Sequence, residues 1–229
     1  MCRHPVQVPT TTAEKGKGSI IAPSNAGGIQ WGGVSYDPQR RLLVTNVNRF
    51  AAVITLIPRQ EFSKAVEQTG QRPLTEMAPQ RGTPYALKRE YLVTIDERGP
   101  QMNTAPPWGT LAAVDMPTGE TRWEVPLGSM YPPDVFPEAE QWGSLNFGGC
   151  LTTASGLVFI AASMDGHFRA FDTETGELLW KSPLPAGGQA TPMTYQKTED
   201  GKQYVVIAAG GHGRMGTKLG DYVVAFALP

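Results

Sequence analysis

Residues Ala170–Trp180 read AFDTETGELLW, and a close copy, AVDMPTGETRW, occupies Ala113–Trp123. Both copies follow one pattern: Ala, any residue, Asp, two further residues, Thr-Gly, three residues and Trp. An aspartate can accept the backbone N–H groups of a turn, and a glycine supplies the left-handed conformation that closes it, so each copy predicts a β-hairpin. The tryptophan on the outgoing strand offers a large apolar area and one N–H donor, which suits it to dock one unit on the next.

Short β-rich runs separated by turn residues lie around both copies. No segment shows a helical period over more than about ten residues, although RQEFSKAVEQ (59–68) could form a short helix. The two copies begin 57 residues apart, at Ala113 and Ala170. Repeats at this distance, each of about four strands, are typical of β-propeller blades. The sequence therefore predicts an all-β protein, a β-propeller of four-stranded antiparallel blades. After the first hundred residues the expected strands are Thr110–Asp115, Thr121–Pro126, Cys150–Thr153, Leu157–Ala162, His167–Asp172, Leu178–Pro183, Ala190–Tyr195, Tyr204–Ala209 and Tyr222–Ala227.

These strands group into about three blades. The first is expected over residues 28–127, with a long insertion at 59–107 between its second and third strands. The second covers 148–184, and the third covers 189–228 with three strands and no fourth. Residues 1–20 are polar and are expected to form a flexible arm. Three blades cannot close a ring, so an isolated chain would leave unpaired sheet edges that favour aggregation, dimerisation or binding of a complementary fragment.

Composition excludes several classes of function. The formal net charge is −1 with a pI near 6.3, so nothing points to nucleic acid or to an anionic membrane surface. The two cysteines, Cys2 and Cys150, lack the spacing of a zinc site, and Cys150 is expected to be a small buried apolar residue. No stretch has the apolar length of a signal peptide or of a membrane-spanning helix.

Two tempting motifs have simpler explanations. Asp115 and Asp172 could suggest a pair of carboxylates for acid–base chemistry, but their place in the repeat makes them turn formers. The stretch GGHGRMG (210–216) could suggest a phosphate-binding loop, but it lacks the Lys-Ser/Thr of that loop and no helix is expected after it.

The chain resembles the dehydrogenases that use pyrroloquinoline quinone (PQQ), and within them the membrane-bound glucose and quinate dehydrogenase branch. The stretches that carry the resemblance are GGIQWGGVSYDP, LIPRQEF, GTPYAL, PPWGTLAAVDMPTGETRWEVPLG, DGHFRAFDTETGELLW, LPAGGQATPMTY and GKQYVVIAAGGHGRMGTKLGDYVVAFALP. They follow one continuous order from about Ile20 to Pro229 and resemble the C-terminal part of that branch, its last three blades.

The resemblance implies an eight-bladed propeller that oxidises a sugar or alcohol hydroxyl on the periplasmic side of the inner membrane. The family holds PQQ with a calcium ion and passes electrons to ubiquinone. Its catalytic aspartate, calcium ligands and cofactor-binding lysine belong to earlier blades, and no positions here match them. We therefore expect the missing blades as an upstream segment or partner chain, and no catalytic or metal-binding residue in this chain.

Three stretches resemble loops that contact the cofactor in that family. They are the GGHG stretch, the stretch QWGSLNFGG and the stretch IQWGGVSYDPQRRLLVTNVN. Glycines allow close approach of the backbone, and the amide, indole and imidazole side chains supply hydrogen bonds or an aromatic face. The candidate cofactor contacts are Trp31, Asn46, Trp142, Asn146, Gly211 and His212.

Two functions remain open on these observations. The chain could be part of a PQQ-dependent dehydrogenase, or it could be a non-catalytic propeller scaffold similar to the outer-membrane assembly lipoprotein that carries the same repeats. A scaffold has no need for GGHGRMG, QWGSLNFGG and PPWG together, so these loops favour the dehydrogenase.

Overall fold

The computed structural model describes residues 18–24, 26–70, 75–97, 99–132, 134–199 and 201–227. They form two compact units. We call residues 28–48 and 106–227 the sheet unit, and residues 49–105 with the described residues up to Gly27 the insertion unit. In the described ranges, no helix combines the length and apolar character needed to cross a bilayer.

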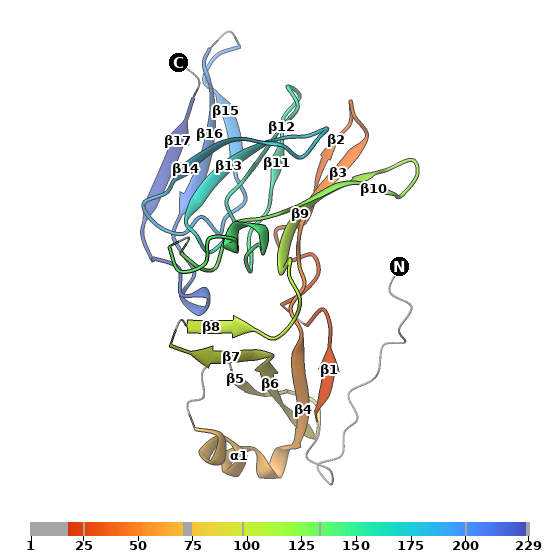
Figure 1. The fold of residues 1–229 in the computed structure, drawn as a ribbon, viewed down its shortest axis with the longest axis vertical. Coiled ribbons are helices and arrows are strands. Elements are labelled where there is room, and N and C mark those ends of the chain that lie inside the picture. The colour runs from red at the N-terminus through yellow and green to blue at the C-terminus, as the bar shows by residue number, and fades with distance from the viewer. Residues whose placement is uncertain are drawn as a thin grey trace. The chain divides into compact units, whose positions relative to one another are not determined.

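The sheet unit contains three antiparallel sheets that follow one another in chain order (Figure 1). The first sheet has the order β10-β9-β3-β2, formed by Thr121–Pro126, Gly109–Asp115, Leu42–Asn48 and Ser35–Asp37. The second has the order β11-β12-β13-β14, formed by Leu151–Thr152, Leu157–Ile160, His167–Asp172 and Leu178–Pro183. The third has the order β15-β16-β17, formed by Met193–Gln196, Gln203–Ala209 and Tyr222–Phe226. The predicted fold class, antiparallel four-stranded blades of a partial propeller, is confirmed.

The repeated stretch forms the hairpin between the last two strands of the first and second sheets. Asp172 Oδ1 accepts hydrogen bonds from the backbone N–H groups of Glu174 and Thr175, each at 2.8 Å. Gly176 closes the turn with φ at +75°. These bonds are the turn chemistry expected from the sequence, and they explain why Asp and Thr-Gly recur together.

Apolar side chains join neighbouring sheets. One core cluster, which includes Val44, Leu111, Val158 and Phe171, lies between the first and second sheets. Cys150 belongs to this cluster and is buried, as expected. A second cluster packs the second sheet on the third; its buried members are Ala161, Phe168 and Ile207. The three sheets are therefore held face to face by side chains that alternate along the strands.

The insertion unit has its own four-stranded sheet. Its order is β1-β4-β6-β5, formed by Ser19–Ile21, Ala52–Pro58, Tyr85–Tyr91 and Thr75–Pro79. Helix α1 (Phe62–Thr69) follows β4 after a short 3₁₀ turn, η2 (Arg59–Glu61). Strands β7 (Val93–Asp96) and β8 (Gly99–Met102) pair as a separate hairpin.

Two predicted boundaries differ from these units. The insertion begins at Arg49 and ends at Ala105, not at 59–107, because strand Ala52–Pro58 pairs with β1 and β6 and not with the first sheet. The expected arm at 1–20 is also too long, since Ser19–Ile21 forms a strand of the insertion unit; residues 1–17 lie outside the described ranges. The alternation of apolar residues predicts a strand but does not identify the partner of that strand.

Candidate functional site

A buried amide network joins the first sheet to the loop that leads into the second. Asn46 on β3 donates from Nδ2 to Asn146 Oδ1 at 2.6 Å and to the Gly148 carbonyl at 3.2 Å. Asn46 is 2% exposed and Asn146 is fully buried. The backbone N–H of Asn146 donates to Asn48 Oδ1 at 2.9 Å, and Asn48 Nδ2 donates to the Asn146 carbonyl at 2.8 Å. Buried amides that satisfy each other in this way fix a loop in one conformation.

Two glycine-containing loops approach each other beside this network. A Cβ atom at Gly32 would lie 2.0 Å from the carbonyl oxygen of Gly148, so no side chain fits there. Gly148 itself adopts φ at +121°, where other residues are strained. Trp31, which precedes Gly32, is 65% exposed. The backbone contact therefore fixes the residue next to Trp31 against the loop of Gly148, while the Trp31 side chain stays exposed.

His212 lies in the loop between β16 and β17. Its backbone N–H donates to Thr217 Oγ1 at 2.8 Å, and its ring packs edge-on against Phe147 with ring centroids 5.4 Å apart. The ring nitrogen Nδ1 is buried and has no hydrogen-bond partner among the described residues. An unsatisfied buried polar atom costs about 1–3 kcal/mol, and such an atom in a native site calls for a ligand or a water.

Gly211, the residue before His212, fixes the backbone of the His212 loop. Its N–H donates to the Gly187 carbonyl at 2.8 Å, its φ is +72°, and a Cβ atom there would lie 2.1 Å from the Lys218 carbonyl oxygen. The need for glycine at this position is therefore explained by contacts inside the chain.

A chain of polar contacts connects the His212 loop to the second sheet. Thr217 Oγ1 donates to Gln189 Oε1 at 3.1 Å, and Gln189 Nε2 donates to the Ser163 carbonyl at 3.0 Å. Ser163 Oγ donates to Asp165 Oδ1 at 2.8 Å. Gln189 and Ser163 are both buried, so this network is shielded from solvent.

The network ends at an ion pair between Asp165 and Arg169. The Arg169 guanidinium donates to both carboxylate oxygens of Asp165, and the side chain of Arg169 is 4% exposed. Burial alone would raise the pKa of Asp165, but the hydrogen bonds and positive charge of Arg169 outweigh burial and the pKa is lowered. The carboxylate is thus ionised at neutral pH and anchors the turn before β13.

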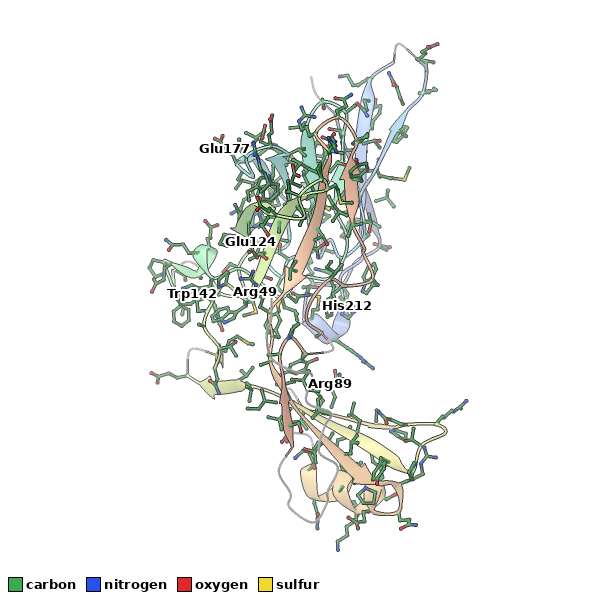
Figure 2. All side chains as sticks on the ribbon, turned by 90° about the vertical axis from the view of Figure 1, so that its right-hand side faces the viewer. Arg49, Arg89, Glu124, Trp142, Glu177 and His212 are labelled. Carbon is green, nitrogen blue, oxygen red and sulfur yellow. The ribbon has the colours of Figure 1, made fainter. Side chains whose placement is uncertain are left out.

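Trp142 lies in a different environment. Its ring contacts Trp108, Tyr131 and Phe136 at centroid distances of 5.5, 5.9 and 5.4 Å, in edge-on or tilted arrangements. Figure 2 shows Trp142 and His212 on opposite sides of the sheet unit. The aromatic contacts explain the position of Trp142 without a ligand.

Four of the six predicted residues lie along one connected path. Asn46 bonds to Asn146, the next residue Phe147 packs on His212, and Gly211 precedes His212 in the chain. Trp31 lies next in sequence to the contact of Gly32 with Gly148, and Trp142 lies apart. Sequence reasoning missed three further members of the network. Each is a polar residue that becomes buried at the end of a strand or in a tight loop, a pattern that a single sequence does not display. They are Asn48, Gln189 and Thr217.

A model of the family described as "Glucose/ethanol/alcohol dehydrogenase, beta-propeller domain", named PQQ, matches residues 4–205. The chain belongs to this family of PQQ-dependent dehydrogenases. It is 41% identical over 223 residues to the quinoprotein glucose dehydrogenase of Escherichia coli (strain K12). It is 39% identical over 217 residues to a probable quinate dehydrogenase (quinone) of Xanthomonas campestris pv. juglandis. The predicted family is confirmed.

The match covers 93% and 92% of this chain but only 27% of each of those two relatives, so the chain spans about a quarter of their length. Two solved structures agree with this chain in fold. A europium-containing methanol dehydrogenase matches with a TM-score of 0.57 at 23% identity, covering 85% of this chain and 27% of its own. A quinohemoprotein alcohol dehydrogenase of Pseudomonas putida HK5 matches with a TM-score of 0.54 at 27% identity, covering 85% and 24%.

The chemistry of the His212 loop is compatible with a quinone cofactor in one respect. The unpartnered Nδ1 of His212 can donate to a carboxylate or quinone oxygen, or accept a hydrogen bond, depending on its tautomer. Both Nδ2 bonds of Asn46 are made inside the chain, which leaves Oδ1 as the atom of that side chain that can face a ligand. Among the described residues, no group of three or more His, Cys, Asp or Glu side chains gathers as a metal site.

Proposed function

We propose that this chain forms one part of a PQQ-dependent dehydrogenase that oxidises a sugar or alcohol hydroxyl and transfers the electrons to a quinone acceptor, on the periplasmic side of the inner membrane. The observation that carries the proposal is the family match over residues 4–205, together with the unpartnered His212 Nδ1 in the His212 loop. When bound, PQQ supplies the two-electron acceptor for the C–H bond of the substrate.

The residues of this chain would form one wall of the cofactor pocket. His212 would hydrogen-bond a cofactor oxygen through Nδ1, and the exposed Trp31 would offer an aromatic face. Asn46, fixed by Asn146, would present Oδ1, while the Gly211 backbone would shape the loop. Trp142 would contribute indirectly: its aromatic cluster would support the loop before β11.

The catalytic base and the calcium ligands are assigned, in this proposal, to the part of the longer polypeptide outside these 229 residues. Calcium bound there would polarise the quinone, and the base would take the hydroxyl proton of the substrate. The sheets contributed by that part would complete the pocket from the opposite side.

The test uses the chain assembled with the complementary part of the Escherichia coli relative, in the presence of calcium. Binding of PQQ is followed by its absorbance, and turnover by reduction of a quinone dye with glucose as the substrate. We expect His212→Ala to weaken PQQ binding about tenfold or more, which corresponds to one lost hydrogen bond to a charged group. His167→Ala is the matched control, because His167 bonds to the Asp165 carbonyl, at the far end of the chain of polar contacts that begins at Thr217.

Equal PQQ affinity of the two histidine variants would contradict the role of His212. An assembled protein that does not bind PQQ at all would contradict the proposed function and favour the non-catalytic scaffold.

A further inference from the structure

Two loops of the sheet unit meet beside the start of β13. The first loop follows β10 and carries Met130, and the second joins β12 to β13 and carries Met164. The backbone N–H of Ser129 donates to Asp165 Oδ2 at 3.1 Å, so the residue before Met130 is bonded to the residue after Met164. This bond brings the backbones of the two methionines together without using the side chain of either.

Close packing reinforces the junction of the two loops. A Cβ atom at Gly128 would lie 2.3 Å from Ser163 Cβ, so the first loop passes the second at a distance that only glycine allows. Gly128 also has φ at +67°, in the left-handed region. The second loop is fixed from a further side, because the Met164 N–H donates to Ser144 Oγ at 2.9 Å. The backbones of both loops are thus held by contacts inside the chain.

His167 follows Met164 by three residues and presents an unoccupied ring nitrogen. Its Nδ1 lies 2.9 Å from the carbonyl oxygen of Asp165, which can only accept, so Nδ1 carries the proton in this contact. The neutral ring then has a lone pair on Nε2, and within the described ranges no residue bonds to Nε2. A histidine that donates its other nitrogen to a backbone carbonyl is typical of metal ligands, because that bond fixes the tautomer and the ring orientation.

The side chains of Met130, Met164 and His167 line one pocket, which has a volume of about 330 Å³. All three residues are half-buried, and the His167 side chain is 30% exposed, so an ion in solution can reach them. Methionine is unbranched and has three rotatable bonds, so both sulfurs can move toward an ion held by the imidazole.

The charged groups around this pocket are already paired. The Asp165 carboxylate accepts from the guanidinium of Arg169, and Lys181 Nζ donates to Glu140 Oε1 at 2.8 Å. Two carboxylates thus balance two cations, and neither carboxylate is left without a counter-charge. Hard cations such as calcium and magnesium require several oxygen ligands, so this pocket does not suit them.

Two thioether sulfurs and one imidazole nitrogen form a soft, uncharged set of ligands. Thioethers select Cu(I) among the biological metal ions, and imidazole also suits copper. Zinc sites are formed by thiolate, imidazole and carboxylate groups, and this pocket offers one imidazole and no thiolate. The chemistry of the pocket therefore favours a soft monovalent ion.

We propose that Met130, Met164 and His167 form a binding site for Cu(I). The ion is bound by both methionine sulfurs and by Nε2 of the histidine. None of the residues that line this pocket belongs to the candidate cofactor contacts, so His167 serves a different site from the one proposed for PQQ. The inference goes beyond the proposed function and does not depend on it.

The test uses silver(I), a soft monovalent ion that needs no reducing agent. The 229-residue chain is labelled with carbon-13 at the methyl groups of its eight methionines and is titrated with Ag(I), and each methionine signal is followed by NMR. Every protein in the test carries Cys2→Ser, because a free thiol also binds soft metal ions. Met130→Leu and Met164→Leu assign the two signals, since leucine conserves the volume of methionine.

We expect the signals of Met130 and Met164 to shift together and to reach their end point at one ion per chain. The matched control is Met193, which is 55% exposed and whose signal should stay in place over the same range. His167→Gln should weaken Ag(I) binding about tenfold or more, whereas Met193→Leu should leave the affinity unchanged. Zinc(II) should shift neither of the two signals.

Spectra of the variants without metal check that they are folded. A shift of the Met193 signal along with the other two would overturn the proposal, because it would indicate binding to any exposed methionine. Equal Ag(I) affinity of His167→Gln and the unmodified chain would also overturn it, as would a stronger response to zinc(II). Competition with a coloured Cu(I) chelator under reducing conditions then measures copper itself, and a chain that binds Ag(I) but not Cu(I) would overturn the assignment of the ion.

Discussion

The side-chain amide of Asn46 donates to the side-chain oxygen of Asn146 at 2.6 Å, across 100 residues of sequence. Asn46 lies on β3 of the first sheet, and Asn146 lies in the loop that enters the second sheet. Since both side chains are buried, this contact fixes the position of the loop that carries Phe147, and through Phe147 the ring of His212.

Removing the Asn46 side chain should destabilise the sheet unit. Asn46→Ala leaves Asn146 Oδ1 and the Gly148 carbonyl without their donor, and we expect a loss of about 2–3 kcal/mol in the free energy of unfolding. Urea denaturation measures this loss. Gln39→Ala removes an exposed amide and should change stability by less than about 0.5 kcal/mol. Equal effects of the two substitutions would contradict the structural role given to Asn46.

The sequence predicts the sheets well because the repeat is local. Asp172, Thr175 and Gly176 form their turn within a few residues, so the pattern alone identifies the hairpin and its two strands. Trp123 follows the same logic, since a large apolar side chain on the outgoing strand has to be buried against a neighbour.

The candidate site is harder to predict from the sequence, because its contacts join residues that are far apart along the chain. The bond from Gln189 to the Ser163 carbonyl and the bond from Thr217 to Gln189 exist only after three sheets have packed together. Resemblance to a family indicated Asn46 and His212, but nothing in the sequence pattern distinguishes the buried Asn48 from a solvated asparagine. The insertion boundary expected at residue 59 differs from Arg49 for the same reason, since the pairing of Ala52–Pro58 with β6 is a long-range contact.

The ion pair of Asp165 with Arg169 should make stability depend on acid pH. The pKa of Asp165 is lowered in the folded chain, so its stabilising contribution is complete above the ordinary pKa of aspartate, about 4, and is lost as the pH falls through the lower folded value. Asp165→Asn leaves the buried Arg169 without its counter-charge, and we expect a loss of about 3 kcal/mol near pH 7.

Urea denaturation at several pH values tests this expectation. The stability difference between the unmodified chain and Asp165→Asn should be constant from about pH 7 to 5 and should shrink below about pH 4. Glu140→Gln serves as a comparison, because Glu140 pairs with Lys181 while its side chain stays 66% exposed, and its loss should cost less than about 1 kcal/mol. A difference that grows toward low pH would contradict the assignment.

The two hairpin glycines should respond differently to the same substitution. Gly176→Asn places a side chain where the indole of Trp123 lies, so we expect the chain to lose about 2 kcal/mol or more of stability. Gly119→Asn meets open space among the described residues and should cost less than about 1 kcal/mol. Thermal unfolding of the chain without any partner measures both. Similar losses at the two positions would show that backbone conformation, and not the tryptophan, determines the requirement for glycine.

The insertion unit should be removable without loss of the three sheets. Strands β3 and β9 are antiparallel neighbours, and Asn48 pairs with Gly109, so the insertion leaves and re-enters the sheet unit where a hairpin loop would close. The insertion unit also recruits β1, so residues 1–27 should be removed with 49–105. A turn of the sequence Asn-Gly with short flanks would then connect β3 to β9.

The shortened protein should keep its β-sheet circular dichroism and the near-ultraviolet signal of Trp123, because the cluster of Val44, Leu111 and Phe171 is unchanged. Loss of the near-ultraviolet signal in a soluble shortened protein would show that the first sheet depends on the insertion unit for its structure.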